Sequence, residues 1–341
     1  LSNDLNIQKD RIQLYQNQVF VTDNVEGIVP EFLTMLRGVI DSPDIPLNVS
    51  RSYLQADGAV KKISSYITKK VADKLKSLFN NNREDFETKW NDIKIVIEYG
   101  MLSEEKFFEK SEAFVLYPTI DGAYYTYDEL YNKIKAKQTD KNDKLVILYA
   151  SNAEEQHSYI QAAKAKGYEV LLLDSPIVSH WIQKLEASKE NISFARVDAD
   201  HIDKLIQKEE NTISKLTEEE KTKLDELLKE VISSEKFIVQ LEAMDSSAAP
   251  FIITQPEFMR RMKEMQQTGG GGMFGMGHMP ELYNLVVNTN SDLVNEILNT
   301  KTAKKRERLI NQSLDLAQLS QGLLKGEALT NFIKRSYEMI K

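Results

Sequence analysis

An arginine and a glutamine near residue 50 are the side chains in this sequence best suited to act on a phosphate. Arg51 and Gln55 are four residues apart, so they share one face if the chain is helical there. Pro43 and Pro46 prevent a helix from running through the preceding loop, and Ser50 is a good N-cap, so a helix is expected to begin at Arg51. A helix N-terminus favours an anion, and a guanidinium adds positive charge to it. The alternative is an arginine that caps a carboxylate within its own domain.

The stretch Gly38–Gln55, GVIDSPDIPLNVSRSYLQ, resembles the middle-domain signature of the heat-shock protein 90 chaperones, in particular the bacterial HtpG branch. The family pattern is roughly GVVDSxDLPLNxSRExLQ, and this chain departs from it at Ser52, where the family usually has Glu. The resemblance implies that Arg51 contacts the γ-phosphate of ATP held in a separate N-terminal domain, that Gln55 assists, and that Asn48 shapes the loop. It also implies that ATP with Mg²⁺ is bound by that absent domain and that these residues hold no cofactor themselves.

The composition bounds the class of protein. A chain of 341 residues predicts two or three domains, and 41% hydrophobic with 28% charged residues is typical of a soluble protein. The absence of cysteine fits a reducing compartment, so we expect a cytoplasmic protein. A net charge of −8 argues against nucleic-acid binding, and no apolar run is long enough for a membrane helix. The start at Leu1 indicates a piece of something longer.

Three apolar runs alternate with helical patterns in the middle of the chain. Leu145–Tyr149, Val170–Leu173 and Ile192–Val197 are expected to be buried strands, which predicts a small parallel βαβαβ sheet. The turn after the first run, ASNAEEQ, has neither the G-x-G-x-x-G nor the G-x-x-x-x-G-K-[ST] motif, so a nucleotide-binding enzyme of those classes is rejected. The resemblance continues here through LVILYA and AKGYEVLLLDSPI. It implies that Trp181 contacts client polypeptides, although His180 replaces the family's acidic neighbour. The alternative is a core tryptophan.

A methionine-rich helix is expected to begin near Pro256. Methionine adapts to irregular apolar surfaces, so such a helix suits the binding of non-native polypeptide. The glycine-rich stretch that follows predicts a flexible loop. The matching helix of the chaperone family contacts clients, and the predicted contact residues are Phe258, Met259, Met262, Met265 and Phe274. The alternatives are methionines packed in the core and a soft-metal site at Met273, Met276, His278 and Met279.

Two helices are expected at the end of the chain, at about Ala303–Leu323 and Glu327–Ile340. Their apolar residues lie on more than one side, which predicts a partner, and two such hairpins can close a four-helix bundle across a twofold axis. The family uses its C-terminal helices in this way. The predicted dimer-interface residues are Leu309, Leu316, Leu319, Leu323, Phe332, Ile333 and Tyr337. The alternative is that the hairpin packs on the chain's own sheet.

Together these observations predict an α/β and α+β multidomain chain. Residues 1–210 are expected to form part of a middle domain, with helices followed by the small parallel βαβαβ sandwich, and residues 211–341 an α+β C-terminal domain ending in the dimerising hairpin. The implied function is that of an ATP-dependent chaperone, a homodimer that binds non-native clients and has other chaperones as further partners. The full-length protein would hydrolyse ATP, and this chain alone would not. The alternative is a dimeric polypeptide-binding scaffold with no nucleotide role.

Overall fold

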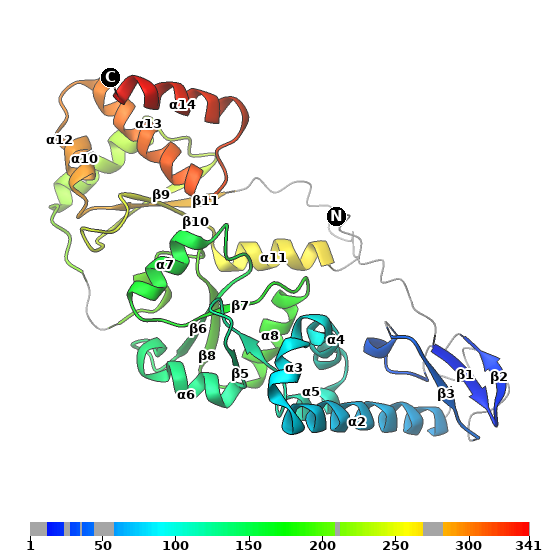
Figure 1. Cartoon of the computed structure of the whole chain (residues 1–341). Helices are drawn as coiled ribbons and strands as arrows, with labels where there is room; N and C mark the ends of the chain where they lie inside the picture. Colours follow the sequence, from blue (N-terminus) through cyan, green and yellow to red (C-terminus); the bar gives the residue numbers. More distant parts are fainter. Residues whose placement is uncertain are drawn as a thin grey trace. The chain divides into compact units, whose positions relative to one another are not determined.

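The computed structural model in Figure 1 describes residues 12–23, 28–34, 36–43, 58–208, 212–268 and 282–340. The chain divides into two compact units. The first comprises Leu1–Lys133, Ser175–Glu190 and Gln267–Gly269, and the second comprises Ile134–Asp174, Asn191–Gln266 and Gly270–Lys341. The described residues form a mixture of helices and small sheets, which confirms the predicted mixed α/β and α+β class. The predicted domain boundary near residue 211 stays a prediction.

The first unit contains a three-stranded sheet and a group of helices. The sheet has the order β2-β1-β3, in which β1 pairs antiparallel with β2 and parallel with β3. The elements of the first unit in chain order are β1 Ile12–Gln16, β2 Val19–Thr22, the 3₁₀ turn η1 Glu31–Leu33, β3 Gly38–Asp41, α2 Gly58–Asn81, α3 Arg83–Thr88, α4 Trp90–Ser103, α5 Glu105–Ser111, the pair β4 Tyr117–Pro118 and β5 Tyr124–Tyr125, and α8 Val178–Ser188. The helix α6, Tyr127–Gln138, begins in this unit and ends in the second.

Aromatic rings form the core of the first unit. The ring centroids of Phe32 and Phe107 are 4.6 Å apart, and Phe114 lies edge-on to Phe107 at 6.1 Å. Gly100 lies inside α4 where these rings approach the backbone, because a Cβ there would be 2.8 Å from the ring of Phe107 and 2.9 Å from that of Phe32. Any side chain at position 100 would therefore displace an aromatic core residue.

The start of α6 is held by an ion pair between Arg83 of α3 and Glu129 of α6. Glu129 accepts a hydrogen bond from the backbone N–H of Thr126 at 2.8 Å, as the capping-box spacing predicts. Arg83 donates hydrogen bonds to both carboxylate oxygens of Glu129, at 2.5 and 2.7 Å, and to the carbonyl of Tyr124 at 2.9 Å. The hydrogen bonds from Arg83 lower the pKa of Glu129 to about 2. This contact therefore depends on an ionised carboxylate.

Replacing Arg83 with methionine is expected to change how stability responds to acid. The folded pKa of Glu129 lies below its unfolded value, so its stabilising contribution is complete above about pH 4.5 and is lost as the pH falls toward 2. Without Arg83 this part of the acid sensitivity should disappear. Urea unfolding between pH 3 and 7 measures it, and tryptophan fluorescence reports on the first unit because Trp90 and Trp181 both belong to that unit.

Lys89→Met provides the control for this experiment. It removes an exposed pair, Lys89 with Asp85 at 2.6 Å, and exposed pairs contribute little to stability. An Arg83→Met profile that runs parallel to the wild-type profile through the acid range would contradict the assigned role of Glu129.

The second unit begins with a three-stranded parallel sheet. Its order is β7-β6-β8, with β6 in the centre and paired parallel to both neighbours. Every residue of β6 is buried, as the continuous apolar run predicts. The helix α7 follows β6 and ends before Gly167, whose φ of +72° suits glycine. The elements of this segment are β6 Leu145–Ala150, α7 His157–Ala165, β7 Val170–Leu172, β8 Ile192–Arg196 and α9 Ile202–Leu205.

The rest of the second unit is a mixed sheet covered by helices. The strand β11 lies in the centre, parallel to β9 and antiparallel to β10. A complete capping box between Thr217 and Glu220 starts α10. Buried side chains of the sheet and of α10, α12 and α13 share one hydrophobic core. The elements are α10 Glu218–Lys229, β9 Phe237–Glu242, β10 Phe251–Thr254, α11 Glu257–Thr268, β11 Tyr283–Asn288, α12 Asp292–Asn299, α13 Ala303–Ser320 and α14 Gly326–Ile340.

Candidate functional site

The predicted phosphate-binding residues Arg51, Gln55 and Asn48 lie outside the described residues. The structure describes the segments on either side of them. On one side β3 pairs with β1, and the backbone N–H of Ser42 donates to the carbonyl of Tyr15 at 3.0 Å. On the other side α2 begins at Gly58. The role of the three residues stays a prediction.

Trp181 is a core residue in this structure. Its side chain is fully buried in α8, where it stacks on Tyr117 with ring centroids 5.5 Å apart. Its indole N–H points at the sulfur of Met101, 3.2 Å away. The prediction that Trp181 contacts clients therefore needs correction, because an indole enclosed by its own unit has no surface to offer. The alternative, a core tryptophan, describes the position that the structure shows.

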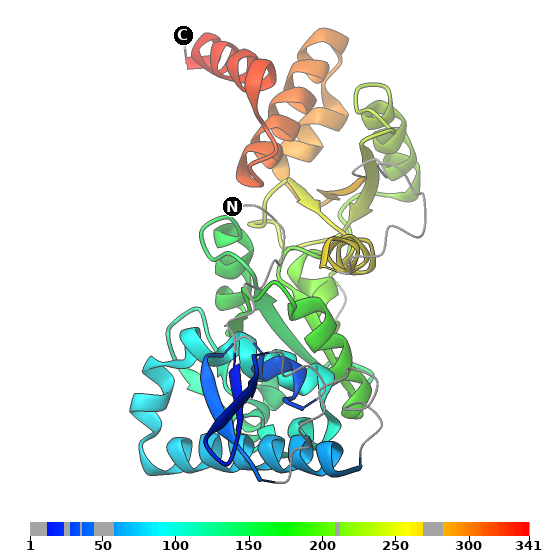
Figure 2. The same cartoon turned by 90° about the vertical axis from the view of Figure 1, so that its right-hand side faces the viewer.

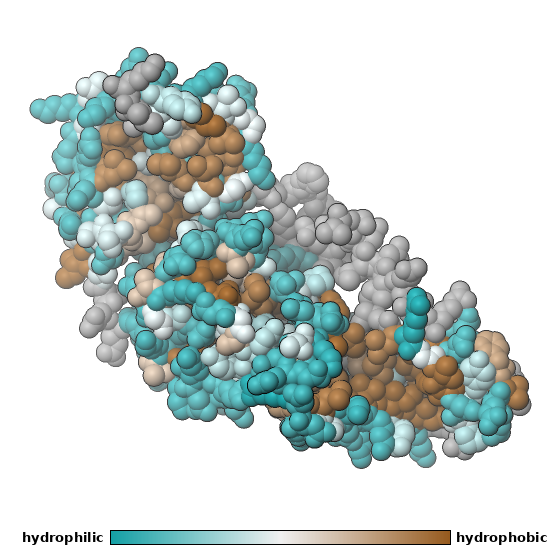
Figure 3. Space-filling model, viewed as in Figure 1, coloured by the Kyte–Doolittle hydropathy of each residue, from teal (hydrophilic) through white to brown (hydrophobic). Residues whose placement is uncertain are grey.

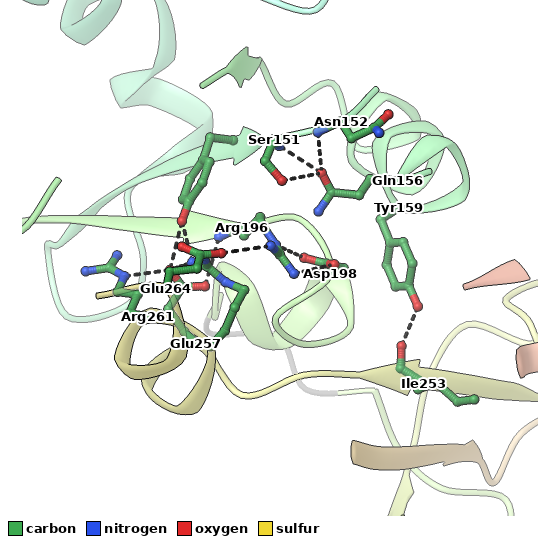
Figure 4. A network of polar contacts seen from close by, with 12 residues as sticks. Ser151, Asn152, Gln156, Tyr159, Arg196, Asp198, Ile253, Glu257, Arg261 and Glu264 are labelled. Carbon is green, nitrogen blue, oxygen red and sulfur yellow. Dashed lines mark hydrogen bonds and ion pairs between the residues drawn. The ribbon is translucent and has the colours of Figure 1, made fainter. Parts of the chain in front are cut away.

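The methionine-rich helix is α11, and charged residues hold it in place. Glu257, Arg260, Arg261 and Glu264 recur at the three- and four-residue spacing of one helical face. Figure 4 shows how this face meets the strand β8 and the segment after it. Arg260 donates to Glu264 at 2.6 Å and to Glu257 at 2.5 Å. Arg261 donates to Glu257 and to the backbone carbonyl of Phe194 in β8, both at 2.7 Å.

Residues of the parallel sheet complete this network. Tyr149 of β6 donates to Glu257 at 3.1 Å and accepts from Arg260. Arg196, at the end of β8, holds Asp198 with two hydrogen bonds of 2.6 and 2.9 Å and lies 3.4 Å from Glu264. The helix is thus attached to both strands by charged groups that share partners.

Arg260 is the buried centre of the network, with 3% of its surface exposed. Burial is the largest influence on its pKa and lowers it, but Tyr149, Glu257 and Glu264 together raise the pKa above its ordinary value. Burial also raises the pKa of the Tyr149 phenol, with Glu257 adding to the effect. Arg260 therefore stays charged and Tyr149 stays protonated, which gives each hydrogen bond in the network a defined donor. Removing one partner would leave a buried charge uncompensated.

The opposite side of α11 exposes apolar side chains. Phe258 is 71% exposed and Met259 is 39% exposed, while Met262 is half-buried. The alternative that these residues pack in the core is wrong for Phe258 and Met259. Of the other two predicted contacts, the side chain of Met265 and the whole of Phe274 lie outside the described part of the chain. Figure 2 looks nearly along α11, drawn in yellow.

Sequence reasoning identified this helix but not the way it is attached. An amphipathic helix normally buries its apolar side, whereas α11 buries Arg260 and exposes Phe258. The spacing of Glu257, Arg260, Arg261 and Glu264 was a usable signal, because alternating charges at three- and four-residue intervals can satisfy one another. What the local sequence could not show is that Tyr149 and Arg196 supply partners from the sheet.

The terminal helices α13 and α14 contact each other. Gln312 donates to Ser336 at 3.0 Å, and Arg335 pairs with Asp315. Of the predicted interface residues, Leu316, Leu319, Ile333 and Tyr337 are exposed, and Leu309 and Leu323 are partly buried. Phe332 is only 8% exposed, so it packs within its own chain and is corrected to a core position. On the face seen in Figure 3, apolar side chains gather over the region where Figure 1 draws α13.

Side chains of the turn after β6 already occupy several of its backbone N–H groups. The amide oxygen of Gln156 accepts from the backbone N–H groups of Ser151 and Asn152 at 2.8 and 3.0 Å (Figure 4). The side chain of Asn152 accepts from the N–H groups of Glu154 and Glu155 at 3.0 and 3.2 Å. A phosphate at this turn would have to displace both side chains, which agrees with the absence of a glycine-rich motif.

Among the described residues, no group of three or more His, Asp or Glu side chains is arranged to hold a metal ion. The alternative of a soft-metal site at Met273, Met276, His278 and Met279 falls outside the described residues. None of the described helices combines the length and the apolar character needed to span a bilayer.

Comparison with known proteins gives one family. The sequence model of the family described as Hsp90 protein matches residues 1–341. A protein of Bacteroides thetaiotaomicron called Chaperone protein HtpG is 42% identical over 407 aligned residues, which cover 100% of this chain and 60% of the relative. A protein of Porphyromonas gingivalis, also called Chaperone protein HtpG, is 41% identical to this chain, and the alignment covers 59% of its length. This chain therefore spans about 60% of the length of these curated relatives.

Proposed function

The chain belongs to the Hsp90 protein family, and from this premise we propose that it is part of an ATP-dependent molecular chaperone that binds and remodels non-native proteins. The proposal rests on that family match together with one observation, which is that α11 buries Arg260 and exposes apolar side chains. A helix that is held by the buried Arg260 and its ion pairs, and that exposes Phe258 and Met259, presents apolar side chains at its surface. Exposed apolar surface of this kind marks a site for apolar polypeptide.

The ATP-dependent step is assigned to the loop before α2. The match of the Asn48, Arg51 and Gln55 motif to the family pattern supports a contact between Arg51 and the γ-phosphate of ATP. A guanidinium there would stabilise the charge that develops as the phosphoryl group is transferred. We place the ATP pocket and its Mg²⁺ in the part of the relatives that this chain does not cover, so the 341 residues alone should not hydrolyse ATP.

Membership of this family also leads to a proposed division of the chain into two domains. Residues 1–210 would form part of a middle domain that includes a βαβαβ sandwich built on β6, β7 and β8. Residues 211–341 would form a C-terminal domain in which α13 and α14 make the dimerising hairpin. The parallel pairing of the three strands and the exposed apolar residues of the terminal helices support this assignment. The cytoplasmic location and the other chaperones as partners stay predictions.

The client-binding part of the proposal is tested by making the exposed side of α11 polar. The double variant Phe258→Ser, Met259→Ser should weaken binding of a chemically unfolded reporter protein by at least about tenfold, because each apolar anchor in an interface contributes on the order of 1–2 kcal/mol. Light scattering of the aggregating reporter in the presence of this chain measures the loss. The chain should remain folded, since both side chains are exposed.

Ile213→Ser is the matched control, because Ile213 is 86% exposed and belongs to neither α11 nor the terminal helices. It should leave reporter binding unchanged. Equal protection of the reporter by the double variant, the control and the wild type would exclude α11 as the contact surface.

A further inference from the structure

The sulfur atoms of this chain are concentrated in α11 and the stretch after it. The 341 residues contain ten methionines and no cysteine, so all of their sulfur atoms are thioethers. Six of the ten methionines lie between residues 259 and 279, and the structure describes the side chains of the first two, Met259 and Met262. A thioether can take up one oxygen atom to become a sulfoxide, which turns a flexible apolar side chain into a polar one. Oxidation at α11 would therefore act on the surface proposed to hold clients.

The described methionine side chains differ in how far solvent reaches them. Met259 is 39% exposed and Met262 is half-buried. Met101 and Met244 are 0% and 2% exposed, and the indole N–H of Trp181 lies 3.2 Å from the sulfur of Met101. A dissolved oxidant attacks the side chains that it can reach, so susceptibility follows exposure. Among these four side chains Met259 is the most open to attack, and the two core methionines are protected.

The contacts that attach α11 do not use sulfur. Arg260 and Arg261 hold the helix through hydrogen bonds to Glu257 and to a backbone carbonyl of β8. The whole network, part of which Figure 4 draws, joins oxygen and nitrogen atoms. These contacts would remain after Met259 is oxidised. A sulfoxide at this position would therefore change the exposed side of the helix and leave its attachment to the sheet in place.

The new polar group would stand beside the other exposed apolar residue of α11. Phe258 and Met259 are adjacent in the chain and are 71% and 39% exposed. The oxygen of a sulfoxide accepts hydrogen bonds from water, and covering it with an apolar polypeptide that offers no donor would be costly. Oxidation of Met259 therefore removes one of the two apolar contacts and adds a penalty for any apolar chain that covers the helix.

We propose that Met259 is a reversible oxidation site, at which conversion to the sulfoxide by a peroxide weakens the binding of apolar polypeptide to α11. The sulfur attacks one oxygen of hydrogen peroxide and the O–O bond breaks. The sulfur is oxidised by two electrons, and the other oxygen leaves as water. Methionine sulfoxide reductases reverse the step, one enzyme for each epimer, as two thiols supply the electrons and the oxygen leaves as water. This inference rests on the proposed client-binding function and makes that function sensitive to oxidants.

Peptide mass spectrometry after limited treatment with hydrogen peroxide tests the site without any client. In the folded chain the sulfoxide should form at Met259 before Met262, while Met101 and Met244 stay reduced. In a chain unfolded in urea all four should be oxidised at similar rates, because folding no longer protects any of them. Oxidation of Met101 or Met244 as fast as Met259 in the folded chain would overturn the proposal.

Reporter binding after the same treatment tests the consequence, with each protein compared with its own untreated sample. The wild-type chain should lose binding by about threefold or more, because one of two apolar contacts becomes polar. Met259→Leu cannot form a sulfoxide and should lose much less. The matched control Met339→Leu removes a methionine of α14 and should lose as much as the wild type. Incubation with both sulfoxide reductases should restore binding by the treated wild-type chain.

An equal loss of binding in the treated wild type and in treated Met259→Leu would also overturn the proposal. Failure of the proposed function itself is distinguishable from this result, because it needs no oxidant. It would appear as full protection of the reporter by the untreated Phe258→Ser, Met259→Ser variant.

Discussion

Replacing Arg51 with alanine is expected to lower ATP turnover of the full-length protein by about 10²-fold or more, which is the usual size of the loss when a transition-state arginine or a comparable donor is removed. ATP affinity should change little, because the nucleotide is proposed to bind in another domain. The guanidinium is proposed to interact with charge that develops on the γ-phosphate in the transition state. Its removal should therefore slow hydrolysis without weakening the binding of ATP. Steady-state hydrolysis together with a separate nucleotide-binding titration measures the two quantities.

Two further variants sharpen this experiment. Arg51→Lys should recover only part of the turnover, because an ammonium lacks the planar fork of the guanidinium. Arg308→Ala removes a half-exposed arginine of α13, 3.8 Å from Glu338, and should leave turnover unchanged. Turnover that survives Arg51→Ala would mean that Arg51 is a structural cap. The function would then be that of the nucleotide-independent, dimeric polypeptide-binding scaffold.

Introducing glutamates at Ile333 and Tyr337 is expected to convert the proposed dimer to monomers. These residues are 44% and 67% exposed on α14, and their spacing of four puts them on one face. If that face is buried against a second copy, two carboxylates there would lie unpaired in an apolar interface, which costs several kcal/mol. Multi-angle light scattering across a dilution series measures the change in mass.

The control places the same charges on other sides of the same helix. Ala328→Glu with Asn331→Glu uses exposed positions that the helical repeat turns away from Ile333 and Tyr337, so the mass should not change. Point variants are preferable to truncation after Asn299, because Ile310, Leu314 and Ala317 of α13 belong to the hydrophobic core. A double variant that keeps the mass of the wild-type dimer would exclude this face as the interface.

The burial of Trp181 could not be predicted from the sequence around it. Its neighbours in α8 make a helical stripe, which is compatible with a core or a surface tryptophan. Tyr117 and Met101, which enclose the indole, lie 64 and 80 residues before it. Nothing within one helix indicates whether such distant residues will cover an aromatic ring, so only the packed structure could decide the burial of Trp181.

The sequence by itself determined the family, the class of fold and the local elements. The continuous apolar run of β6, the capping box of Thr217 and Glu220, and the helix end at Gly167 were all readable because each depends on residues a few positions apart. The tertiary structure alone decided that α11 buries Arg260, because Arg260 meets Tyr149 across 111 residues of chain. Periodicity and capping are local properties, whereas the choice of which face is buried depends on side chains brought together by folding.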